Sequence, residues 1–372
     1  MISSLEKKVY ITNSSSICCA GSNNEELFKN ICSSKSGIKQ IENYFQGHSP
    51  SVGLIESEND FYENLELQFS EILETSNLND FENTLLIIGS SVGGMNHTEN
   101  LFLQTKDYTK IEPNLHNINA IFYLIEKKFS FQDCISFSTA CTSSGNAIGY
   151  AYELLSKGIY KNALVVGIDQ ISQTTVGGFL SLGVLSSNPC KPFDTKRDGM
   201  NVAEAIATLL LQTESNEKCV EVCGVGYSSD AYHMTHPHPN GLGAQKSMNN
   251  ALKSTGLGAK DIQYINAHGT GTQANDEAEA NAIASIFGAD VYVSSTKSIT
   301  GHTLGAASAL EAVICSLILE KQIIPQSTAL ETQENENITL SKDNIQTKIK
   351  YVMSNSFAFG GNNCSLILGA VV

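Results

Sequence analysis

Short apolar stretches with strand character alternate with helical stretches along most of this chain. The strand-like stretches are "TLLIIGS" (84–90), "CISFST" (134–139), "NALVVGI" (162–168), "EVCGVGY" (221–227), "IQYINAHG" (262–269), "VYVSST" (291–296) and "CSLILGA" (364–370). Helical stretches fall near 115–128, after Cys141, and at 242–255, 276–287 and 303–319. This alternation predicts α/β layers, and 372 residues suffice for about two domains of ordinary size.

Two stretches resemble each other at a distance. In one, a strand leads into Cys141 and then into a helix rich in Gly, Ala and Ser. In the other, residues 291–319, a strand leads through a polar loop into the same kind of helix. We therefore expect a duplicated α/β unit, with halves at 1–215 and 216–372.

The helical stretch 303–319 carries one charged residue, Glu311. A helix that is apolar on all sides is buried, and a buried carboxylate needs a partner. The nearest basic residue in the sequence is Lys297, on the preceding loop. We expect a buried contact between Lys297 and Glu311.

Composition and charge exclude several classes of function. The formal net charge of −15 argues against nucleic acid as a partner. We expect no membrane span, because no apolar run reaches the ~18 residues that a span needs. The first residues lack the apolar core of a signal peptide, so the expected location is the cytoplasm. The ten cysteines are scattered, as expected of reduced thiols rather than a disulfide framework.

Cys141 lies where a strand pattern ending at Thr139 gives way to a helical pattern. A helix N-terminus stabilises a thiolate, and the small neighbours of Cys141 leave room for a substrate. This is the arrangement of a strand–turn–helix nucleophile. The local pattern alone leaves two interpretations open, a buried core cysteine and a nucleophile.

Two histidines occupy similar joints between a strand and a helix. His268 ends the strand pattern "YINAH", and His302 precedes the apolar helix. In layered α/β folds such joints gather at one edge of the sheet, where ligands bind. His268, His302 and Cys141 are therefore candidates for one site.

Other polar features have less specific readings. The histidines of "HMTHPHP" (233–239) lack a second ligand group at metal-binding spacing, so we expect a loop and no metal. "GSSVGG" (89–94) lacks the Lys-Ser/Thr of a phosphate loop. Arg197 is the only arginine in the chain, and we expect it to form a structural ion pair, with Asp194 or Asp198, rather than a phosphate contact.

Six segments together resemble the signature segments of the elongating β-ketoacyl-acyl carrier protein synthases. They are "TACTSS" (139–144), "KPFDTKRDG" (191–199), "SSDAYHMTHPHPNG" (228–241), "NAHGTGTQANDEAE" (266–279), "SSTKSITGHTLGAASALEA" (294–312) and "SNSFAFGGNN" (354–363). The resemblance implies a thiolase-like fold, with two similar α/β halves, five αβαβα layers and an obligate dimer.

The resemblance also implies roles for individual residues. Cys141 would be the nucleophile, His268 and His302 its catalytic partners, Lys297 a charge that orders them, and Glu311 the support of Lys297. The backbone N–H groups of Cys141 and Phe359 would bind the acyl oxyanion. The gate would comprise Phe359, Gly360 and Gly361, with a moving loop around Asp230 and His233. Val92 is a candidate for the acyl pocket.

The implied reaction is acyl transfer to Cys141, followed by decarboxylative condensation with malonyl carrier protein to a β-ketoacyl carrier protein. It would serve fatty-acid, aryl-polyene or polyketide synthesis and needs no cofactor, since phosphopantetheine of the acyl carrier protein holds the substrates. The implied partners are that carrier protein and a second subunit. The second subunit would be either another copy of this chain or a homologous subunit similar to a chain-length factor. Candidate residues for carrier docking are Lys127, Lys128, Lys191, Lys196 and Arg197.

Three rival interpretations remain. The chain could be a non-catalytic partner subunit, which would lack the nucleophile. It could be a cysteine hydrolase, in which the second histidine and Lys297 would have no role. A thiolase would use a second, late cysteine, but Cys364 lies in a strand pattern.

The chain also departs from the family pattern at the gate. Ala358 stands where glycine is usual, and Asn362 stands where threonine is common. These departures leave open how the gate moves, and chain-length preference does not transfer with the resemblance.

Overall fold

Most strands of the protein form one continuous mixed sheet in a computed structural model, which describes residues 7–371 apart from 77, 79–82, 127 and 216–218. The strand order is β12-β10-β9-β14-β15-β8-β1-β7-β6-β4-β5. β1 and β8 pair only through Tyr10–Glu221 and Ile11–Val220. The large sheet is therefore two sheets joined at a short seam.

The strands have the following bounds: β1 Tyr10–Cys18, β2 Lys39–Gln40, β3 Ser51–Val52, β4 Thr84–Gly89, β5 Asp133–Phe137, β6 Asn162–Asp169, β7 Ala205–Gln212, β8 Val220–Ser229, β9 Tyr264–Asn266, β10 Tyr292–Ser294, β11 Ile323–Ile324, β12 Thr339–Leu340, β13 Ile345–Gln346, β14 Tyr351–Phe357 and β15 Asn362–Ala370.

The α-helices are α1 Asn24–Cys32, α2 Phe61–Thr75, α3 Met95–Thr105, α4 Ala120–Glu126, α5 Ser143–Ser156, α6 Gln173–Ser181, α7 Leu242–Thr255, α8 Gln273–Phe287, α9 Lys297–Thr300 and α10 Ala307–Lys321. Short 3-10 helices lie at Tyr108–Lys110, Pro113–Leu115, Ala259–Asp261 and Leu304–Ala306.

The two sheets repeat one topology, which confirms the expected duplication. From the seam outwards, the N-terminal sheet runs β1, β7, β6, β4, β5, with two antiparallel pairings followed by two parallel ones. The C-terminal sheet runs β8, β15, β14, β9, β10 with the same sequence of pairings. The predicted boundary at 215/216 adjoins residues outside the described part of the chain, so it stays a prediction.

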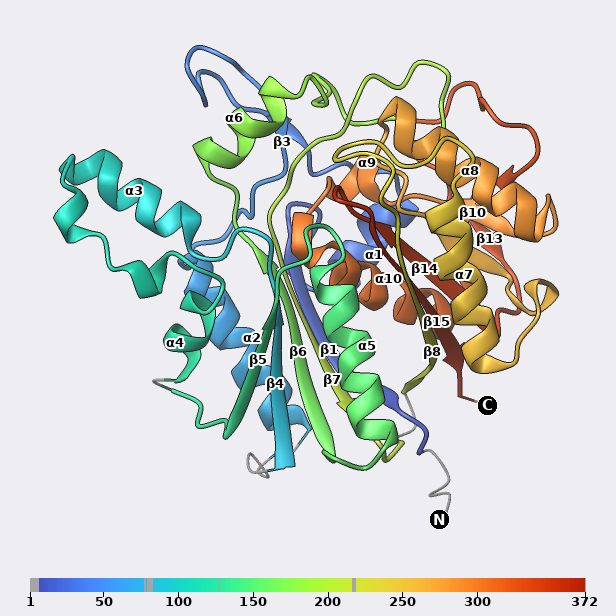
Figure 1. Cartoon of the computed structure of the whole chain (residues 1–372), viewed down its shortest axis with the longest axis horizontal. Coiled ribbons are helices and arrows are strands. Elements are labelled where there is room, and N and C mark those ends of the chain that lie inside the picture. Colours follow the sequence, from blue (N-terminus) through green and yellow to red (C-terminus); the bar gives the residue numbers. More distant parts are fainter. Residues whose placement is uncertain (1–6, 77, 79–82, 127, 216–218, 372) are drawn as a thin grey trace.

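Five layers stack in the order helix, sheet, helix, sheet, helix, as expected (Figure 1). Helix α2 covers the outer face of the N-terminal sheet, while α7 and α8 cover that of the C-terminal sheet. Helices α5 and α10 contact both sheets and form the central layer. The apolar runs of β4 and β6 are buried throughout, as expected for strands covered on both faces.

Several helix bounds differ from the sequence prediction. The stretch 303–319 begins with a 3-10 turn, so α10 starts at Ala307. The stretch 115–128 yields only α4, Ala120–Glu126, because a separate 3-10 turn starting at Pro113 precedes it. Helix α7 matches its predicted range of 242–255. Among the described residues, no helix is both long enough and apolar enough to span a membrane.

The central helix α5 lies very close to the C-terminal sheet. A Cβ atom placed on Gly149 would lie 1.8 Å from the hydroxyl oxygen of Tyr227 on β8. On the neighbouring turn of α5, a Cβ atom on Gly145 would lie 2.9 Å from Oγ of Ser308 on α10. The small residues that the sequence places after Cys141 are therefore needed for packing as well as for the turn.

We predict that Gly149→Ala lowers the free energy of unfolding by roughly 1–3 kcal/mol, because the added methyl group overpacks the α5–β8 contact. Chemical denaturation measures the change. Gly178 is the matched control, since it also lies inside a helix and a Cβ atom there meets nothing within 4 Å. Gly178→Ala should be neutral or stabilising by up to about 1 kcal/mol. Equal effects of the two substitutions would contradict the close approach of α5.

Candidate active site

Cys141 lies in a strained turn between β5 and α5, which we call the nucleophile turn (residues 139–142). Ala140 has φ +53°, a left-handed conformation that costs a non-glycine residue about 1–2 kcal/mol. Hydroxyl groups hold this conformation: Oγ of Ser143 and Oγ of Ser91 donate to the Ala140 carbonyl, at 2.6 and 2.9 Å. The turn places Cys141 directly before Thr142, the N-cap of α5, and so at the helix N-terminus, as the sequence predicted.

The Cys141 thiol is buried and 9% exposed. Burial raises the pKa of this thiol to about 11, against the opposing effects of the Lys297 charge and of the backbone N–H groups of Phe359 and Cys141. The resting group is therefore a thiol whose ionisation depends on nearby positive charge and N–H donors.

Both predicted histidines lie close to Cys141, with a ring nitrogen of each within 4.8 Å of Sγ. Nε2 of His302 lies 3.0 Å from Sγ of Cys141, and the rings of His302 and His268 are 5.2 Å apart and nearly perpendicular. Both rings are 2% exposed. Burial, and then the charge of Lys297, lowers the pKa of each imidazole well below its usual value. Both rings are therefore neutral at physiological pH, and each has one N–H donor and one acceptor nitrogen.

Lys297 and Glu311 form the buried ion pair that the sequence predicted. Nζ of Lys297 contacts Oε1 of Glu311, and their side chains are 1% and 4% exposed. Lys297 is the first residue of the short helix α9, which ends at Thr300, two residues before His302. The pair therefore fixes a positive charge beside the thiol and both imidazoles.

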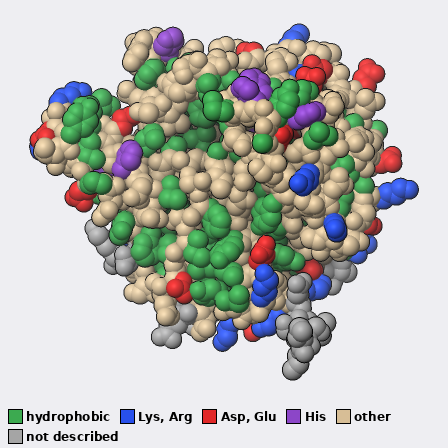
Figure 2. Space-filling view, in the orientation of Figure 1, with side chains coloured by type: hydrophobic (Ala, Val, Ile, Leu, Met, Phe, Trp, Pro, Cys, Tyr) green, Lys and Arg blue, Asp and Glu red, His purple; other side chains and the backbone are tan. Residues whose placement is uncertain are grey.

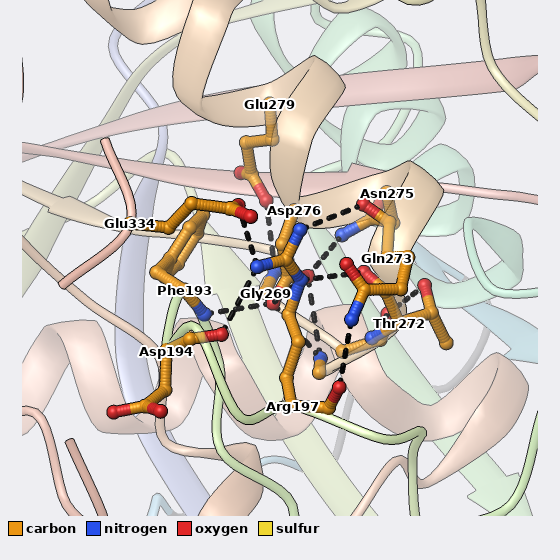
Figure 3. A network of polar contacts seen from close by, with 12 residues as sticks. Phe193, Asp194, Arg197, Gly269, Thr272, Gln273, Asn275, Asp276, Glu279 and Glu334 are labelled. Carbon is orange, nitrogen blue, oxygen red and sulfur yellow. Dashed lines mark hydrogen bonds and ion pairs between the residues drawn. The ribbon is translucent and has the colours of Figure 1, made fainter. Parts of the chain in front are cut away.

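A second buried network holds the turn that carries His268 (Figure 3). Both oxygens of Glu279, on α8, accept backbone N–H groups at 2.8 Å, from His268 and from Gly269. Asp276 accepts the backbone N–H groups of Phe193, at 2.8 Å, and Gly271, at 3.2 Å. Helix α8 thus positions His268 through two carboxylates.

Arg197 belongs to the same network and is 3% exposed. The structural ion pair is confirmed, but its expected partner is wrong. Nη1 of Arg197 pairs with Glu334 at 2.5 Å, and Nε lies 4.0 Å from Asp276. Arg197 contacts Asp194 only through its carbonyl oxygen, at 3.0 Å, since the Asp194 carboxylate accepts backbone N–H groups of residues 196, 331 and 332.

Phe359 lies in a tight turn between β14 and β15, which we call the gate turn (residues 358–361). Gly360 and Gly361 have φ values of +84° and +80°, which favour glycine. The loop containing Asp230 and Met234 contacts this turn: the Asp230 N–H donates to the Gly361 carbonyl at 2.7 Å, and the Gly360 N–H to the Met234 carbonyl at 2.8 Å. The predicted gate and its predicted loop are thus in contact.

The pocket at Cys141 has a volume of about 40 Å³, and its walls combine both sequence halves. Its lining includes Cys141, Phe179, His233, His268, His302 and Phe359. Val92, the candidate for the acyl pocket, packs beside a separate apolar cluster around Val176 and Leu304 and does not line this pocket.

The histidines of the 233–239 loop form no cluster of three potential metal ligands. Among the described residues, the only group of three or more His, Cys, Asp or Glu ligand atoms within 4.8 Å of one another is Cys141, His268 and His302. His233 and His236 approach each other, with their Nδ1 atoms 3.1 Å apart, but both are exposed.

Three of the predicted docking lysines, Lys128, Lys191 and Lys196, have acidic partners. Lys128 pairs with Glu66 at 3.0 Å. Lys191 and Lys196 share Glu331, at 2.5 and 2.7 Å. Lys127 lies outside the described residues. The Arg197 side chain is buried, so it offers no charge to a carrier.

Sequence reasoning missed Asp169, the last residue of β6. Its buried carboxylate accepts the Ser90 hydroxyl at 2.6 Å and backbone N–H groups of Ser91 and Gly305 at 3.0 and 2.6 Å. It thereby joins the loops on either side of the nucleophile turn, and burial raises its pKa to about 6. The available signal was a charged residue ending an otherwise apolar run.

Two family models match adjoining parts of the chain. Residues 64–217 match the N-terminal domain of the beta-ketoacyl synthases, and residues 219–331 match their C-terminal domain. The chain is 32% identical to 3-oxoacyl-[acyl-carrier-protein] synthase 2 of Coxiella burnetii, over 98% of this chain and 99% of the relative.

Solved structures show the same fold. A chain from the complex of a ketosynthase with its chain length factor from Xenorhabdus doucetiae aligns with a TM-score of 0.89 and 32% identity, over 98% of each chain. A beta-ketoacyl synthase from Burkholderia phymatum aligns with a TM-score of 0.87 and 26% identity, over 98% of this chain and 100% of the other.

We predict that neutralising the ion pair slows alkylation of Cys141. The Lys297→Met/Glu311→Gln double variant leaves no unpaired buried charge, but it removes the cation that lowers the pKa of the thiol. That pKa then rises, and the thiolate fraction at pH 8 falls about tenfold for each unit of increase. Intact-protein mass spectrometry with iodoacetamide measures the rate, with Cys141→Ala identifying the site. An unchanged or faster rate would show that Lys297 does not activate the thiol.

We predict that Arg197→Lys destabilises the fold by at least about 2 kcal/mol, because lysine cannot reach Glu334 and the Asp194, Thr272 and Gln273 carbonyls together. Urea denaturation measures the change. Lys196→Ala, at an exposed ion pair, is the control and should change stability by less than about 1 kcal/mol. A similarly small effect of Arg197→Lys would refute the network's structural role.

Proposed function

Because the chain belongs to the β-ketoacyl synthase family, we propose that Cys141, His268 and His302 carry out its condensing reaction. The observation that carries the proposal is the contact of 3.0 Å between His302 Nε2 and the buried Cys141 Sγ, with the His268 ring 5.2 Å from that of His302. The chain is an acyltransferase of the β-ketoacyl-acyl carrier protein synthase type.

In the first step, the Cys141 thiolate attacks the carbonyl carbon of an acyl thioester. The carrier sulfur leaves and takes up the proton that the resting Cys141 thiol gave up, and the acyl group stays on Cys141 as a thioester. The oxyanion formed during attack accepts hydrogen bonds from the backbone N–H groups of Cys141 and Phe359. Both groups lower the pKa of the thiol, which supports their placement beside the reacting sulfur.

In the second step, a malonyl thioester loses CO2 and becomes an enolate. The enolate carbon attacks the acyl carbonyl on Cys141, the new carbon–carbon bond forms, and the cysteine thiolate leaves. His268 and His302 donate hydrogen bonds to the enolate oxygen, a task that suits neutral imidazoles. Their low pKa values support this role over that of a general base that becomes charged.

We propose an acyl carrier protein as the partner that delivers both substrates, with phosphopantetheine as their carrier and no cofactor or metal. The Cys141 sulfur must be free to attack, so a resident ion on Cys141, His268 and His302 would block the reaction. The pathway is fatty-acid, aryl-polyene or polyketide synthesis. We place it in the cytoplasm, which suits a large chain with ten scattered cysteines.

We further propose a dimer, either of two copies or with a subunit similar to a chain-length factor. β5 ends the large sheet, so its outer edge is available for pairing. Figure 2 shows hydrophobic side chains gathered over β5 and α5, where the rings of Phe137 and Tyr150 lie 5.5 Å apart. The complete set of catalytic groups supports the catalytic subunit over a non-catalytic partner.

Intact-protein mass spectrometry tests the reaction. The chain is incubated with a panel of acyl carrier proteins, with and without malonyl carrier protein. We expect a covalent acyl adduct that disappears in Cys141→Ala and is consumed when malonyl carrier protein is added, with a β-ketoacyl carrier protein as product. No adduct with any donor would refute the proposal, and release of free acid without condensation would indicate a hydrolase.

A further inference from the structure

The side chain of Asn362 connects the gate turn to the nucleophile turn. Asn362 is the first residue of β15, directly after the gate turn. Its Oδ1 accepts a hydrogen bond from Nδ2 of Asn146, in the first turns of α5, at 3.0 Å. The Thr142 hydroxyl, next to Cys141, lies 2.7 Å from the same oxygen. Residues more than 200 positions apart therefore meet beside the nucleophile.

Both donors, Asn146 and Thr142, are also hydrogen-bonded to Thr139 in the nucleophile turn. Nδ2 of Asn146 also donates to Oγ1 of Thr139, at 2.8 Å. The single proton of the Thr142 hydroxyl has two acceptors at 2.7 Å, Oδ1 of Asn362 and the Thr139 carbonyl. The two protons of Asn146 Nδ2 serve one acceptor each, whereas the Thr142 proton is shared, so the Asn146–Asn362 bond is the better defined of the two.

On β15, the side chain of Asn362 makes this contact with α5, and the side chain of its neighbour does not. Asn363, the next residue, points to the opposite face, where its Nδ2 donates to Oγ of Ser228 on β8 at 3.1 Å. The Asn362 carbonyl meanwhile accepts the backbone N–H of Ala358, at 2.8 Å, and closes the gate turn. One residue thus closes the turn with its backbone and joins it to α5 with its side chain.

We propose that Asn362 is a positioning residue that fixes the gate turn relative to Cys141. The distance that it controls is the one between the Phe359 N–H and the reacting sulfur. This inference rests on the proposed function, because the Phe359 N–H then stabilises the acyl oxyanion. Asn362 touches no reacting atom and acts through Phe359. Its loss should slow acyl transfer to Cys141 without weakening carrier binding.

Single-turnover acylation tests the inference, with an acyl carrier protein as donor and intact mass as readout. Asn362→Leu retains the side-chain size but removes the acceptor, and we expect acyl transfer to slow about tenfold, the equivalent of one or two net hydrogen bonds. The donor concentration for half-maximal rate should change less than about twofold. Asn13→Leu is the matched control, since Asn13 also lies on a strand and donates to a helix end, at Thr75 and Ser76. It should leave acyl transfer unchanged.

Rescue by Asn362→Asp separates positioning from general structural support. A carboxylate keeps the acceptor, so the maximal acylation rate should return to within about threefold of the unsubstituted chain. Its negative charge raises the pKa of the thiol, so the rate should reach this maximum only at higher pH. An Asn362→Asp rate that stays as low as that of Asn362→Leu at every pH would show that the acceptor is not what matters, and would overturn the positioning role.

A double-mutant cycle with Asn146→Leu completes the test. If the two residues act through their shared bond, acyl transfer in the double variant should be no slower than in the slower of the two single variants. Multiplying losses, or wild-type acylation in a folded Asn362→Leu variant, would overturn the inference. If Asn362→Leu does not fold, the Asn146→Leu and Asn362→Asp variants carry the same comparison. If the unsubstituted chain accepts no acyl group at all, the proposed function fails rather than the positioning role.

Discussion

The buried Lys297–Glu311 pair is the interaction on which the active site depends. It places one cation among groups that burial would otherwise leave without charge. That cation lowers the pKa of the Cys141 thiol and also those of His268 and His302, so it favours the thiolate and keeps the imidazoles neutral. Neither partner is tolerable alone, because a single buried charge costs several kcal/mol. One ion pair thus acts on all three reacting side chains, adding to the effect of burial at the two imidazoles and opposing it at the thiol.

The duplicated fold explains how groups from distant segments come together. The nucleophile turn leads into α5, and the loop with Lys297 and His302 leads into α10, so both reach the site at the starts of the two central helices. His268 and the gate turn come from the C-terminal sheet, which packs on the same layer. Small residues such as Gly149 allow this close packing. The site therefore exists only when both halves are folded together.

Much of the fold and the site could be predicted because the signals are local. Strand and helix periodicity predicted α/β layers, and a single charge in an apolar helix indicated the Lys297–Glu311 pair. A strand–turn–helix pattern made Cys141 a candidate, and the family resemblance implied its role as nucleophile and the five-layer fold. The missed features involve long sequence separations. Arg197 pairs with Glu334 rather than a neighbouring aspartate, and Asn362 meets Asn146 from the far end of the chain. Sequence spacing carries no information about which such residues meet, since tertiary packing decides it.

In the proposed reaction, neutral imidazoles beside a buried cation act on a thioester at Cys141. Nuclear magnetic resonance of the protein labelled with ¹⁵N-histidine tests it most directly, with His268→Asn and His302→Asn variants assigning the two signals. We predict that both rings keep the nitrogen shifts of neutral imidazole at the ordinary histidine pKa of about 6.5, where an exposed histidine is half charged. A charged ring at pH 7, for either histidine, would contradict it.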